Sequence, residues 1–410
     1  MNRGMALITV LITTFLLFAL VGAFLFLTMQ ARILHERHYE NMVALGLAEA
    51  GVDYAIWEIK YGGTDFAGWN EIPSGSHIFK TSLPDFSDAS GNEYGDINIT
   101  VDRSAEPNVI TAEGTFSSLS GPALSRTVRV LVRKDRLFGE YGVLTVERIT
   151  MTGNAGTDGY DSSKGDYGAS YDGKINIDQN GNILTNGTGA PAISLTGNAT
   201  VKGNANTGPE GTISKTGNAS ITGTESHNAD EEMPEVELPQ LSWVYCGSLS
   251  LSGNNSLTRT TNNYQYDSIT LSGNSKLTLS GEINIYVTGN IQTSGNSQII
   301  IEPDSAVSVY FDGNTSISGN GVWNKTKDPS ELSFFGRPTS TNVSLSGNSD
   351  FYGTVYAPSA GLDISGNGCI YGAVGGGTLT LSGNAKVHFD EQLKNDGPAM
   401  GYEPYVWQEK

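Results

Sequence analysis

Hydrophobic positions follow three different patterns along the 410-residue chain. Residues 5–29 form an apolar run without charge or proline, which as a helix would be about 37 Å long, more than the ~30 Å of a hydrocarbon layer. Residues 30–60 continue without proline, and their apolar side chains recur at close to helical spacing. We therefore predict one continuous helix over residues 5–60, of which the first half is a membrane segment. Tyr61-Gly62-Gly63 supplies its end.

The second pattern, period-two alternation, predicts a small antiparallel β region over residues 61–140. It is clearest at 96–101 and 126–133. One face of the later segment carries three valines, Val128, Val130 and Val132. We expect this valine face to pack on the lower half of the helix. The arginines of the opposite face are interpreted as a solvated strand face rather than as a basic docking patch.

The third pattern is a polar signature that recurs from residue 152 onward: Ser or Thr, then Gly, then Asn. Its glycine stands at Gly153, Gly197, Gly217, Gly253, Gly273, Gly289, Gly295, Gly319, Gly347, Gly366 and Gly383. The clearest intervals are 17–20 residues long. A period near 20 residues without helical patterning is typical of a solenoid.

The residues before each signature predict strands. Segments such as 249–251, 269–271 and 379–381 run apolar-polar-apolar into Gly-Asn, a pair that tolerates the positive φ of a sharp corner. One repeat then equals one coil of a parallel β-helix, and parallel crossovers are overwhelmingly right-handed. Asn side chains at equivalent corners are expected to form a hydrogen-bonded ladder. The predicted fold class is mainly β: a long N-terminal α-helix with a small β region, then a right-handed parallel β-helix.

The repeat is interrupted at residues 224–240, an acidic stretch that contains Pro234 and Pro239. Its charges and prolines disfavour a core coil. We interpret it as an extended strap between two blocks of coils, residues 141–223 and 241–391. The last coil needs a cover. We expect residues 392–410 to form this cap through Tyr402, Tyr405, Val406 and Trp407.

Composition narrows the class of protein. With 43 acidic and 24 basic residues the net charge is −19, and such a surface repels phosphate, so no nucleic-acid partner is expected. Two cysteines cannot form a disulfide scaffold. Cys246 and Cys369 lie about five coils apart, or ~24 Å at ~4.8 Å per coil, whereas a disulfide needs Cα atoms within ~7 Å. We predict two separate thiols.

The N-terminal residues resemble a known family. Arg3-Gly4 followed by Met5-Ala6-Leu7-Ile8-Thr9-Val10-Leu11 resembles the class III leader of type IV pilins, most of all that of PilX-type minor pilins. Leu47-Ala48-Glu49-Ala50-Gly51 also fits the far end of that family's N-terminal domain. The resemblance implies that residues 1–4 are a prepilin leader, that prepilin peptidase cuts between Gly4 and Met5, and that the new amine on Met5 is methylated. The alternative is an ordinary signal anchor that is never processed.

Thr9 departs from the pilin pattern. Major pilins carry a glutamate at this fifth mature position, where its carboxylate offsets a neighbour's N-terminal ammonium inside an apolar bundle. Threonine cannot do this. A subunit without the carboxylate, like the similar K-type pseudopilins, suits a filament tip or a priming complex better than the repeating shaft.

The repeat region carries a second resemblance. Residues 158–165 and 353–358, together with Ile364-Ser-Gly-Asn367 and Tyr371-Gly372, resemble the repeat domain found behind PilX-type N-termini in some bacterial pilus-assembly proteins. Residues 141–391 also resemble, more distantly, the polymer-forming bactofilins. The resemblance implies an architecture and carries no catalytic residues.

Candidate chemistry is confined to the start of the repeat region. Parallel β-helices also host polysaccharide lyases and hydrolases, which need clustered carboxylates. Five aspartates precede the regular coils: Asp158, Asp161, Asp166, Asp172 and Asp178. Their spacing does not match a calcium loop, and we interpret the segment as a glycine-rich surface loop. The alternative is a divalent-ion loop, with calcium bound at Asp158, Asp161 and Asp166. We expect no enzyme activity and no other cofactor.

The histidines are too scattered for a histidine-based site, and lone ones such as His227 and His388 are expected to be exposed. The sequence therefore predicts a structural minor pilin of a type IV pilus-like machine, which acts in assembly, tip priming and surface adhesion. Its expected partners are other pilins, the inner membrane and prepilin peptidase. The alternatives are a pilus-borne adhesin that binds carbohydrate, such as a surface glycan, and an unprocessed inner-membrane scaffold. Arg3 keeps the N-terminus cytoplasmic, the bulk is periplasmic, and the final location is the pilus or cell surface.

Overall fold

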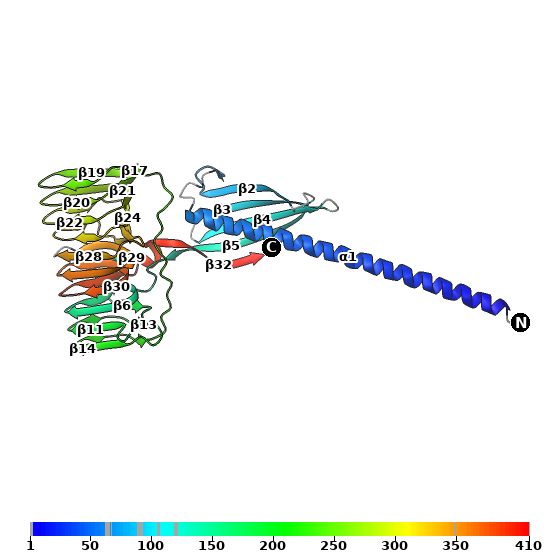
Figure 1. Ribbon diagram of the computed structural model, residues 1–410, viewed down its shortest axis with the longest axis horizontal. Helices are drawn as coiled ribbons and strands as arrows, with labels where there is room; N and C mark the ends of the chain where they lie inside the picture. The colour runs from blue at the N-terminus through cyan, green and yellow to red at the C-terminus, as the bar shows by residue number, and fades with distance from the viewer. Residues whose placement is uncertain are drawn as a thin grey trace. The chain divides into compact units, whose positions relative to one another are not determined.

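The computed structural model describes residues 3–61, 66, 68–87, 93–104, 107–118, 122–347 and 350–409. Within them the chain is mainly β, with one long N-terminal helix and a large sheet of parallel strands (Figure 1). It divides into two compact units: Met1–Lys134 with Tyr402–Lys410, and Asp135–Gly401. Each unit is described by itself.

The first unit is built on α1, Arg3–Tyr61, a single helix of 59 residues. Nearly all described side chains of its N-terminal half are exposed, Phe15 by 74% and Leu20 by 73%. Val10–Ile59 contains a window long and apolar enough to cross a membrane, and none of that window is buried. The hydroxyls of Thr14 and Thr28 donate to the carbonyls of Val10 and Leu25, so these polar groups are satisfied within the helix. This arrangement is compatible with a single-pass membrane anchor.

The C-terminal part of α1 packs on a six-stranded sheet of order β1-β2-β3-β4-β5-β32. The strands are β1 Asn70–Glu71, β2 Ile78–Ser87, β3 Glu93–Asp102, β4 Asn108–Ser118, β5 Leu124–Arg136 and β32 Ala399–Glu409, with β1 to β5 pairing antiparallel in sequence order. Val128, Val130 and Val132 share a buried core with Ala48 and Val52 of the helix. The prediction that the valine face packs on the helix is thus confirmed.

Close contact between α1 and this sheet depends on glycine. A Cβ atom on Gly114 of β4 would lie 2.2 Å from the carbonyl oxygen of Ala44 and 2.5 Å from the amide nitrogen of Ala48. Both contacts are far below van der Waals separation, so a larger residue would push the helix away from the strand.

The second unit is a 24-stranded sheet in which the pairings between strands of successive repeats are parallel. Its first part comprises β6 Val143–Gly153, β7 Gly156–Tyr160, β10 Ile183–Thr185, β11 Ile193–Gly197, β12 Thr200–Val201, β13 Ala205–Thr207, β14 Ile213–Gly217, β15 Ser220–Ile221 and β16 Glu225–Ser226. An insert between β7 and β10 holds the 3-10 helix η1 Ser162–Lys164 and the antiparallel pair β8 Ser170–Tyr171 and β9 Lys174–Ile175.

The later part of the same sheet follows residues 227–243, which form no helix or strand. It comprises β17 Val244–Tyr245, β18 Leu249–Leu251, β19 Ser256–Tyr266, β20 Ile269–Leu271, β21 Lys276–Val287, β22 Ile291–Thr293, β23 Gln298–Ile301, β24 Ala306–Phe311, β25 Thr315–Ile317, β26 Val322–Asn324, β27 Leu332–Gly336, β28 Asn342–Gly347, β29 Phe351–Gly366, β30 Cys369–Leu381 and β31 Lys386–Asp390. The short helices η2 Pro329–Glu331 and α2 Leu393–Asp396 lie in its connections.

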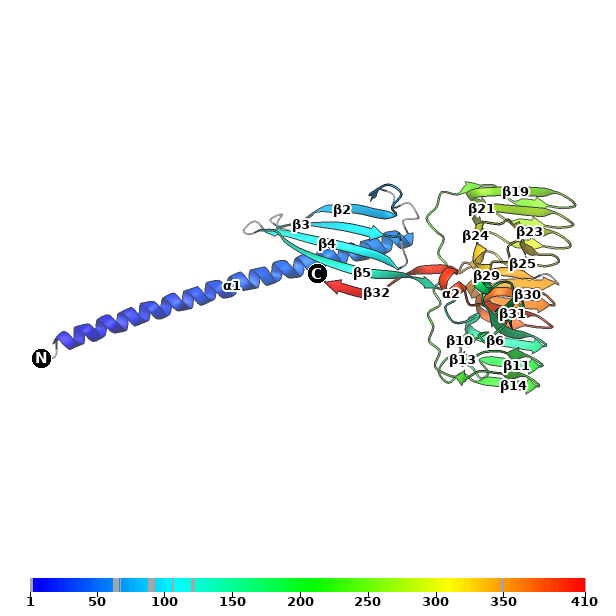
Figure 2. The same ribbon diagram turned by 180° about the vertical axis from the view of Figure 1, so that it is seen from behind.

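The spatial order of these strands differs from their sequence order. The strands that carry the signature pair in the order β18-β20-β22-β25-β28-β29-β30-β6-β11-β14. The chain therefore enters in the interior of the stack, at β6, and its last repeat strands return to pair with its first (Figures 1 and 2). Apolar residues that alternate along the strands, including Ile149, Leu271 and Leu381, form one continuous core.

The signature glycines and asparagines occupy equivalent corners. Gly153, Gly197 and Gly217 are in register and have φ of 77–82°. The adjoining amides donate to one another: Asn198 to Asn154 over 2.9 Å, and Asn218 to Asn198 over 3.0 Å. Similar bonds join Asn154 to Asn384, Asn384 to Asn367, Asn274 to Asn254 and Asn296 to Asn274. The predicted asparagine ladder is confirmed.

The acidic strap was predicted over residues 224–240, but Glu225–Ser226 of that range form β16. Residues 227–243 lead from β16 to β17, which lie at opposite ends of the pairing order. Val236 is buried with Phe335 and Phe389, and the hydroxyl of Tyr356 donates to the carbonyl of Pro234 over 2.8 Å. The apolar and backbone groups of this acidic segment thus fasten it along the sheet.

The expected C-terminal cap over the last coil is wrong. β31 is the last strand of the large sheet along the chain. It pairs with β30 on one side and with β7 on the other, where Lys386 lies opposite Gly156. Residues 399–409 instead form β32 in the six-stranded sheet, next to β5. There Arg133 lies over the Tyr405 ring and Arg129 donates to Gln408, so side chains of β32 contact those of the neighbouring β5. Residues 141–223 and 241–391, which were predicted as two blocks of coils, belong to one sheet, because β30 pairs with β6.

Candidate functional site

A row of polar and aromatic side chains crosses the second unit at right angles to its strands. The register places Tyr352, Tyr371, His388 and Asp158 opposite one another on β29, β30, β31 and β7. The rings of Tyr352 and Tyr371 stack with centroids 4.4 Å apart, and those of Tyr371 and His388 are 4.8 Å apart. We call these four residues the aromatic row.

Asp158 is the last residue of the aromatic row, and it is buried. Its carboxylate accepts hydrogen bonds from Nδ1 of His388, from the Tyr167 hydroxyl over 2.8 Å and from Nζ of Lys202 over 3.2 Å. Asp158 is 4% and His388 3% exposed. Burial alone would raise the pKa of the Asp158 carboxyl, but the bonds from His388 and Tyr167 and the Lys202 charge outweigh it, so the pKa lies below its ordinary value.

The expectation that His388 is exposed is wrong, whereas His227 is exposed, with its Nδ1 2.8 Å from the Thr207 hydroxyl. The insert between β7 and β10 explains the burial of His388, because the Tyr167 ring lies on the imidazole with centroids 4.0 Å apart. The sequence carries a signal that could have found the row. Each member stands five positions after a signature glycine, as Tyr371 does after Gly366.

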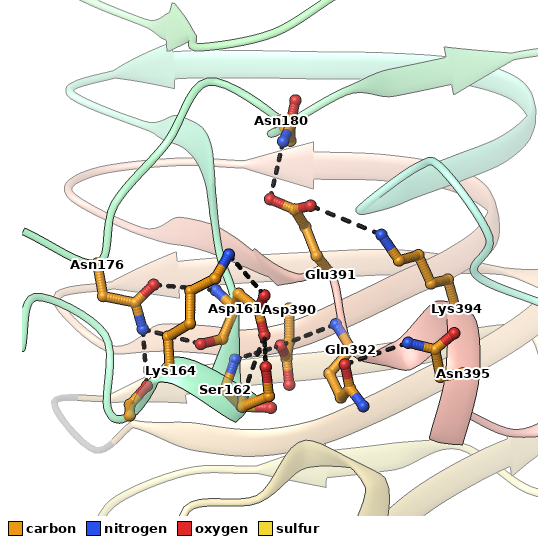
Figure 3. Close-up of polar contacts among 12 residues, drawn as sticks. Asp161, Ser162, Lys164, Asn176, Asn180, Asp390, Glu391, Gln392, Lys394 and Asn395 are labelled. Atoms are coloured by element: carbon orange, nitrogen blue, oxygen red, sulfur yellow. Dashed lines mark hydrogen bonds and ion pairs between the residues drawn. The ribbon is translucent and has the colours of Figure 1, made fainter. Parts of the chain in front are cut away.

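Hydrogen bonds between side chains and backbone hold the insert together and join it to the end of β31 (Figure 3). Asp161 caps η1 by accepting from the Ser163 amide over 3.0 Å. The Asn176 side chain donates to the carbonyls of Asp161 and Gly165 over 2.9 and 2.7 Å. Asp390, 1% exposed, accepts from the Ser162 and Gln392 amides. These bonds fix the insert to the surface of the sheet.

The structure does not bring Asp158, Asp161 and Asp166 together as ion ligands. Asp158 faces His388, Asp161 pairs with Lys164 over 2.8 Å, and Asp166 pairs with Lys327 over 2.6 Å. Within the described part of the chain, no group of three or more His, Cys, Asp or Glu side chains could hold a metal ion. Of the two remaining aspartates in the insert, Asp172 is exposed and Asp178 contacts Glu391.

Asp178 of the insert forms a carboxyl pair with Glu391. Burial and the neighbouring Glu391 carboxyl raise the pKa of Asp178 to about 7. The bond with Asp178 also holds the pKa of Glu391 below its usual value, with help from Asn180, whose side chain donates to Glu391 over 2.8 Å. Figure 3 shows Glu391 between Asn180 and Lys394. The pair shares one proton up to near-neutral pH.

A cavity of about 410 Å³ opens beside the aromatic row. It lies between the insert, the connection that carries η2, and the start of α2. We call it the insert cavity; its wall is formed by Tyr160, Ser162, Ser163, Gly165, Asp166, Tyr167, Thr326, Lys327, Asp328, Glu331, Tyr352, Gln392 and Asp396. The wall combines tyrosine rings with hydroxyl, amide and carboxylate groups, an arrangement suited to binding a small polar ligand.

The processing residues lie at the other end of the chain. Gly4 and Met5 are in the first turns of α1, and Thr9 follows on the same helix; the side chains of Met5 and Thr9 lie outside the described set. Cys246 and Cys369 are free thiols, as predicted from their separation. Burial and Asp350 raise the pKa of the Cys369 thiol, which disfavours the reactive thiolate.

Comparisons with known proteins give a family model and solved structures that are similar to this chain. A model for a domain of unknown function (DUF7305) matches residues 246–396, which is less than half of the chain. A solved structure, that of the competence-associated pilin ComZ from Thermus thermophilus, aligns over 90% of this chain and 97% of its own at 11% identity and a TM-score of 0.28. No curated protein matches the chain.

Proposed function

We propose that this chain is a structural subunit of pilin type, anchored by α1 and carrying a right-handed β-solenoid as its displayed part. The observation that carries the proposal is the division of α1. Its first half exposes apolar side chains on all sides, and its second half packs through small residues on an antiparallel sheet. A helix that is apolar all round needs either lipid or other such helices as its surroundings.

The N-terminal residues make the proposal more specific. Arg3-Gly4-Met5 stands directly before the apolar run, where a prepilin leader would end. We infer cleavage after Gly4 by prepilin peptidase, followed by methylation of Met5. Thr9 lacks the carboxylate that a shaft subunit uses to offset a neighbour's ammonium, so a minor pilin at a tip or in a priming complex is the preferred role.

The second unit supplies the displayed part. Its parallel pairings, the register of signature glycines and the asparagine ladder are the features expected of stacked coils. Strand pairing satisfies the backbone groups, and the core grows linearly with the number of coils, so the structure needs no disulfide. We infer a scaffold without enzymatic activity, located in the inner membrane with its bulk in the periplasm and later in the filament or at the cell surface.

Immunogold labelling of filaments, paired with a Gly4→Leu variant, tests this function. We expect label at filament ends or at filament bases, and loss of both label and filaments in the variant, because a bulky residue blocks cleavage. Label along the whole filament would contradict the tip assignment. Unchanged mobility and location of the variant would favour the unprocessed inner-membrane scaffold.

A second candidate, a pilus-borne adhesin, is favoured by one observation, the polar, tyrosine-lined insert cavity on the second unit. Deletion of the gene separates the two functions. Loss of filaments indicates assembly, whereas normal filaments with poor attachment indicate adhesion.

A further inference from the structure

The insert cavity carries an excess of negative charge. Four carboxylates line it, those of Asp166, Asp328, Glu331 and Asp396, against the single lining cation Lys327. That lysine already pairs with Asp166 over 2.6 Å. Asp328 and Asp396 accept hydrogen bonds from neutral groups of Ser330 and Gln392, which satisfy lone pairs but do not cancel charge. The wall therefore attracts a cation.

A buried hydroxyl in the same wall lacks a partner. Tyr160 is 1% exposed, and its hydroxyl has no hydrogen-bond partner among the described residues. Tyr160 belongs to the cavity wall, and burial raises the pKa of its phenol, so the hydroxyl stays protonated. An unsatisfied buried hydroxyl is destabilising, and a water molecule or a ligand group that reached it from the cavity would supply the missing hydrogen bond.

The remaining lining groups restrict the chemistry of a ligand. Tyr167 and Tyr352 are partly exposed, and the side of each ring that is not against His388 or Tyr371 can meet a ring or a cation. Ser162, Ser163, Thr326 and Gln392 add neutral donors and acceptors around the cavity. A metal ion is not indicated, because no group of ligating side chains converges in the described residues. The volume, about 410 Å³, lies in the range of small-molecule sites.

We propose that the insert cavity binds an amino sugar, with the ring against the tyrosine faces and the ammonium group toward Asp328 and Glu331. The hydroxyls of the sugar meet the serine, threonine and glutamine groups, and one of them bonds the Tyr160 hydroxyl. This site lies entirely within Asp135–Gly401, and it exists whether or not α1 assembles into a filament.

Saturation-transfer NMR and calorimetry on the full chain in detergent test the proposal, with glucosamine, N-acetylglucosamine and glucose as probes. We expect saturable binding of glucosamine with a Kd near ~1 mM or tighter, and at least ~10-fold weaker binding of the two uncharged sugars. Raising the sodium chloride concentration from 0.05 to 0.5 M should weaken the binding of glucosamine. Equal affinity for all three sugars, or no saturable binding, would overturn the proposal.

Two variants locate the site. Asp328→Asn removes one lining charge, but asparagine still caps η2, so the fold should persist while glucosamine affinity falls ~10-fold. Tyr160→Phe removes only the unpartnered hydroxyl, and we expect a ~5-fold loss of affinity without loss of thermal stability.

Matched controls lie outside the cavity. Glu282→Gln on β21 removes a charge from an exposed residue, and Tyr310→Phe removes a tyrosine hydroxyl elsewhere in the sheet. Both controls should bind glucosamine like the natural protein. If Tyr160→Phe also binds normally, its hydroxyl holds water only and the proposed contact is wrong. If Glu282→Gln weakens binding as much as Asp328→Asn, the attraction is a property of the whole acidic surface, and the site is wrong.

Discussion

The Asp158 carboxylate accepts a hydrogen bond from Nδ1 of His388 across 230 positions of sequence. The two residues meet because β7 and β31 pair in parallel with Asp158 opposite His388. The first strands of the second unit, β6 and β7, thus pair with its last strands, β30 and β31. This pairing leaves no unpaired strand edge where the beginning and the end of the repeat region meet. A buried hydrogen bond to a carboxylate lies at this junction.

Asp158→Asn should destabilise the second unit. The substitution keeps the shape but leaves Lys202 and His388 without the carboxylate that both face. We expect a loss of about 2–4 kcal/mol in the free energy of unfolding, measured by urea denaturation in detergent with near-ultraviolet circular dichroism. Asp172→Asn is the control, since Asp172 is exposed and asparagine tolerates its φ of 48°. Equal stability of the two variants would show that the buried contact is not stabilising.

The carboxyl pair of Asp178 and Glu391 should produce a pH dependence. The pKa of Asp178 is raised to about 7 in the folded chain, so its contribution to stability is full below the unfolded value of ~3.9 and is lost as the pH rises toward 7. Urea unfolding at pH 5 and pH 7.5 should show a smaller decline in Asp178→Asn than in the natural protein. An identical decline in both would mean that the pair does not share a proton.

Asp158 should act in the opposite pH range. Its pKa is lowered on folding, so the stabilisation that it provides is present above ~3.9 and is lost as the pH falls through the folded value. Below pH 4 the free energy of unfolding of Asp158→Asn should therefore approach that of the natural protein. A difference that stays constant from pH 7 to pH 3 would contradict this assignment.

Signature glycines should differ in their tolerance of alanine. Gly319 and Gly253 have similar φ of 73° and 65°, so alanine strains both backbones by about 1–2 kcal/mol. A Cβ on Gly319 would also lie 1.8 Å from the carbonyl oxygen of Gly295, whereas one on Gly253 meets nothing within 4 Å. Gly319→Ala should thus lower the free energy of unfolding by at least ~2 kcal/mol more than Gly253→Ala. Similar losses in the two variants would contradict the close stacking of these corners.

The helix contact of the first unit gives a second matched pair. Gly114→Ala places a Cβ 2.2 Å from the Ala44 carbonyl oxygen and should cost about 2–3 kcal/mol by displacing α1 from the sheet. Gly46→Ala lies on the same helix with nothing within 4 Å of its Cβ, and it should stabilise by about 0.5–1 kcal/mol through helix propensity. Limited proteolysis and thermal unfolding provide the readout. A neutral Gly114→Ala would contradict the close approach.

The local features of the fold could be predicted because each rests on residues close in sequence. The apolar run predicts α1, the valine alternation predicts its contact, and the Ser/Thr-Gly-Asn corners predict parallel strands with an asparagine ladder. These signals depend on side-chain period and on glycine φ, which a single sequence displays directly.

The long-range order could not be predicted in the same way. All signature corners are chemically alike, so nothing local indicates that β30 pairs with β6 or that the chain enters in the interior of the stack. The burial of His388 follows from that pairing and from the insert that brings Tyr167 onto its ring. The destination of residues 399–409 depends on which sheet edge is free, which is a property of the folded molecule.

Mass spectrometry of the N-terminal peptide from the membrane-extracted protein shows whether the chain is processed as a pilin. We expect a mature chain that begins at an N-methylated Met5, because Arg3-Gly4 precedes the exposed apolar half of α1 as a leader would. A chain that still carries Met1 to Gly4 would contradict the pilin-type assignment and leave the protein as an unprocessed membrane scaffold.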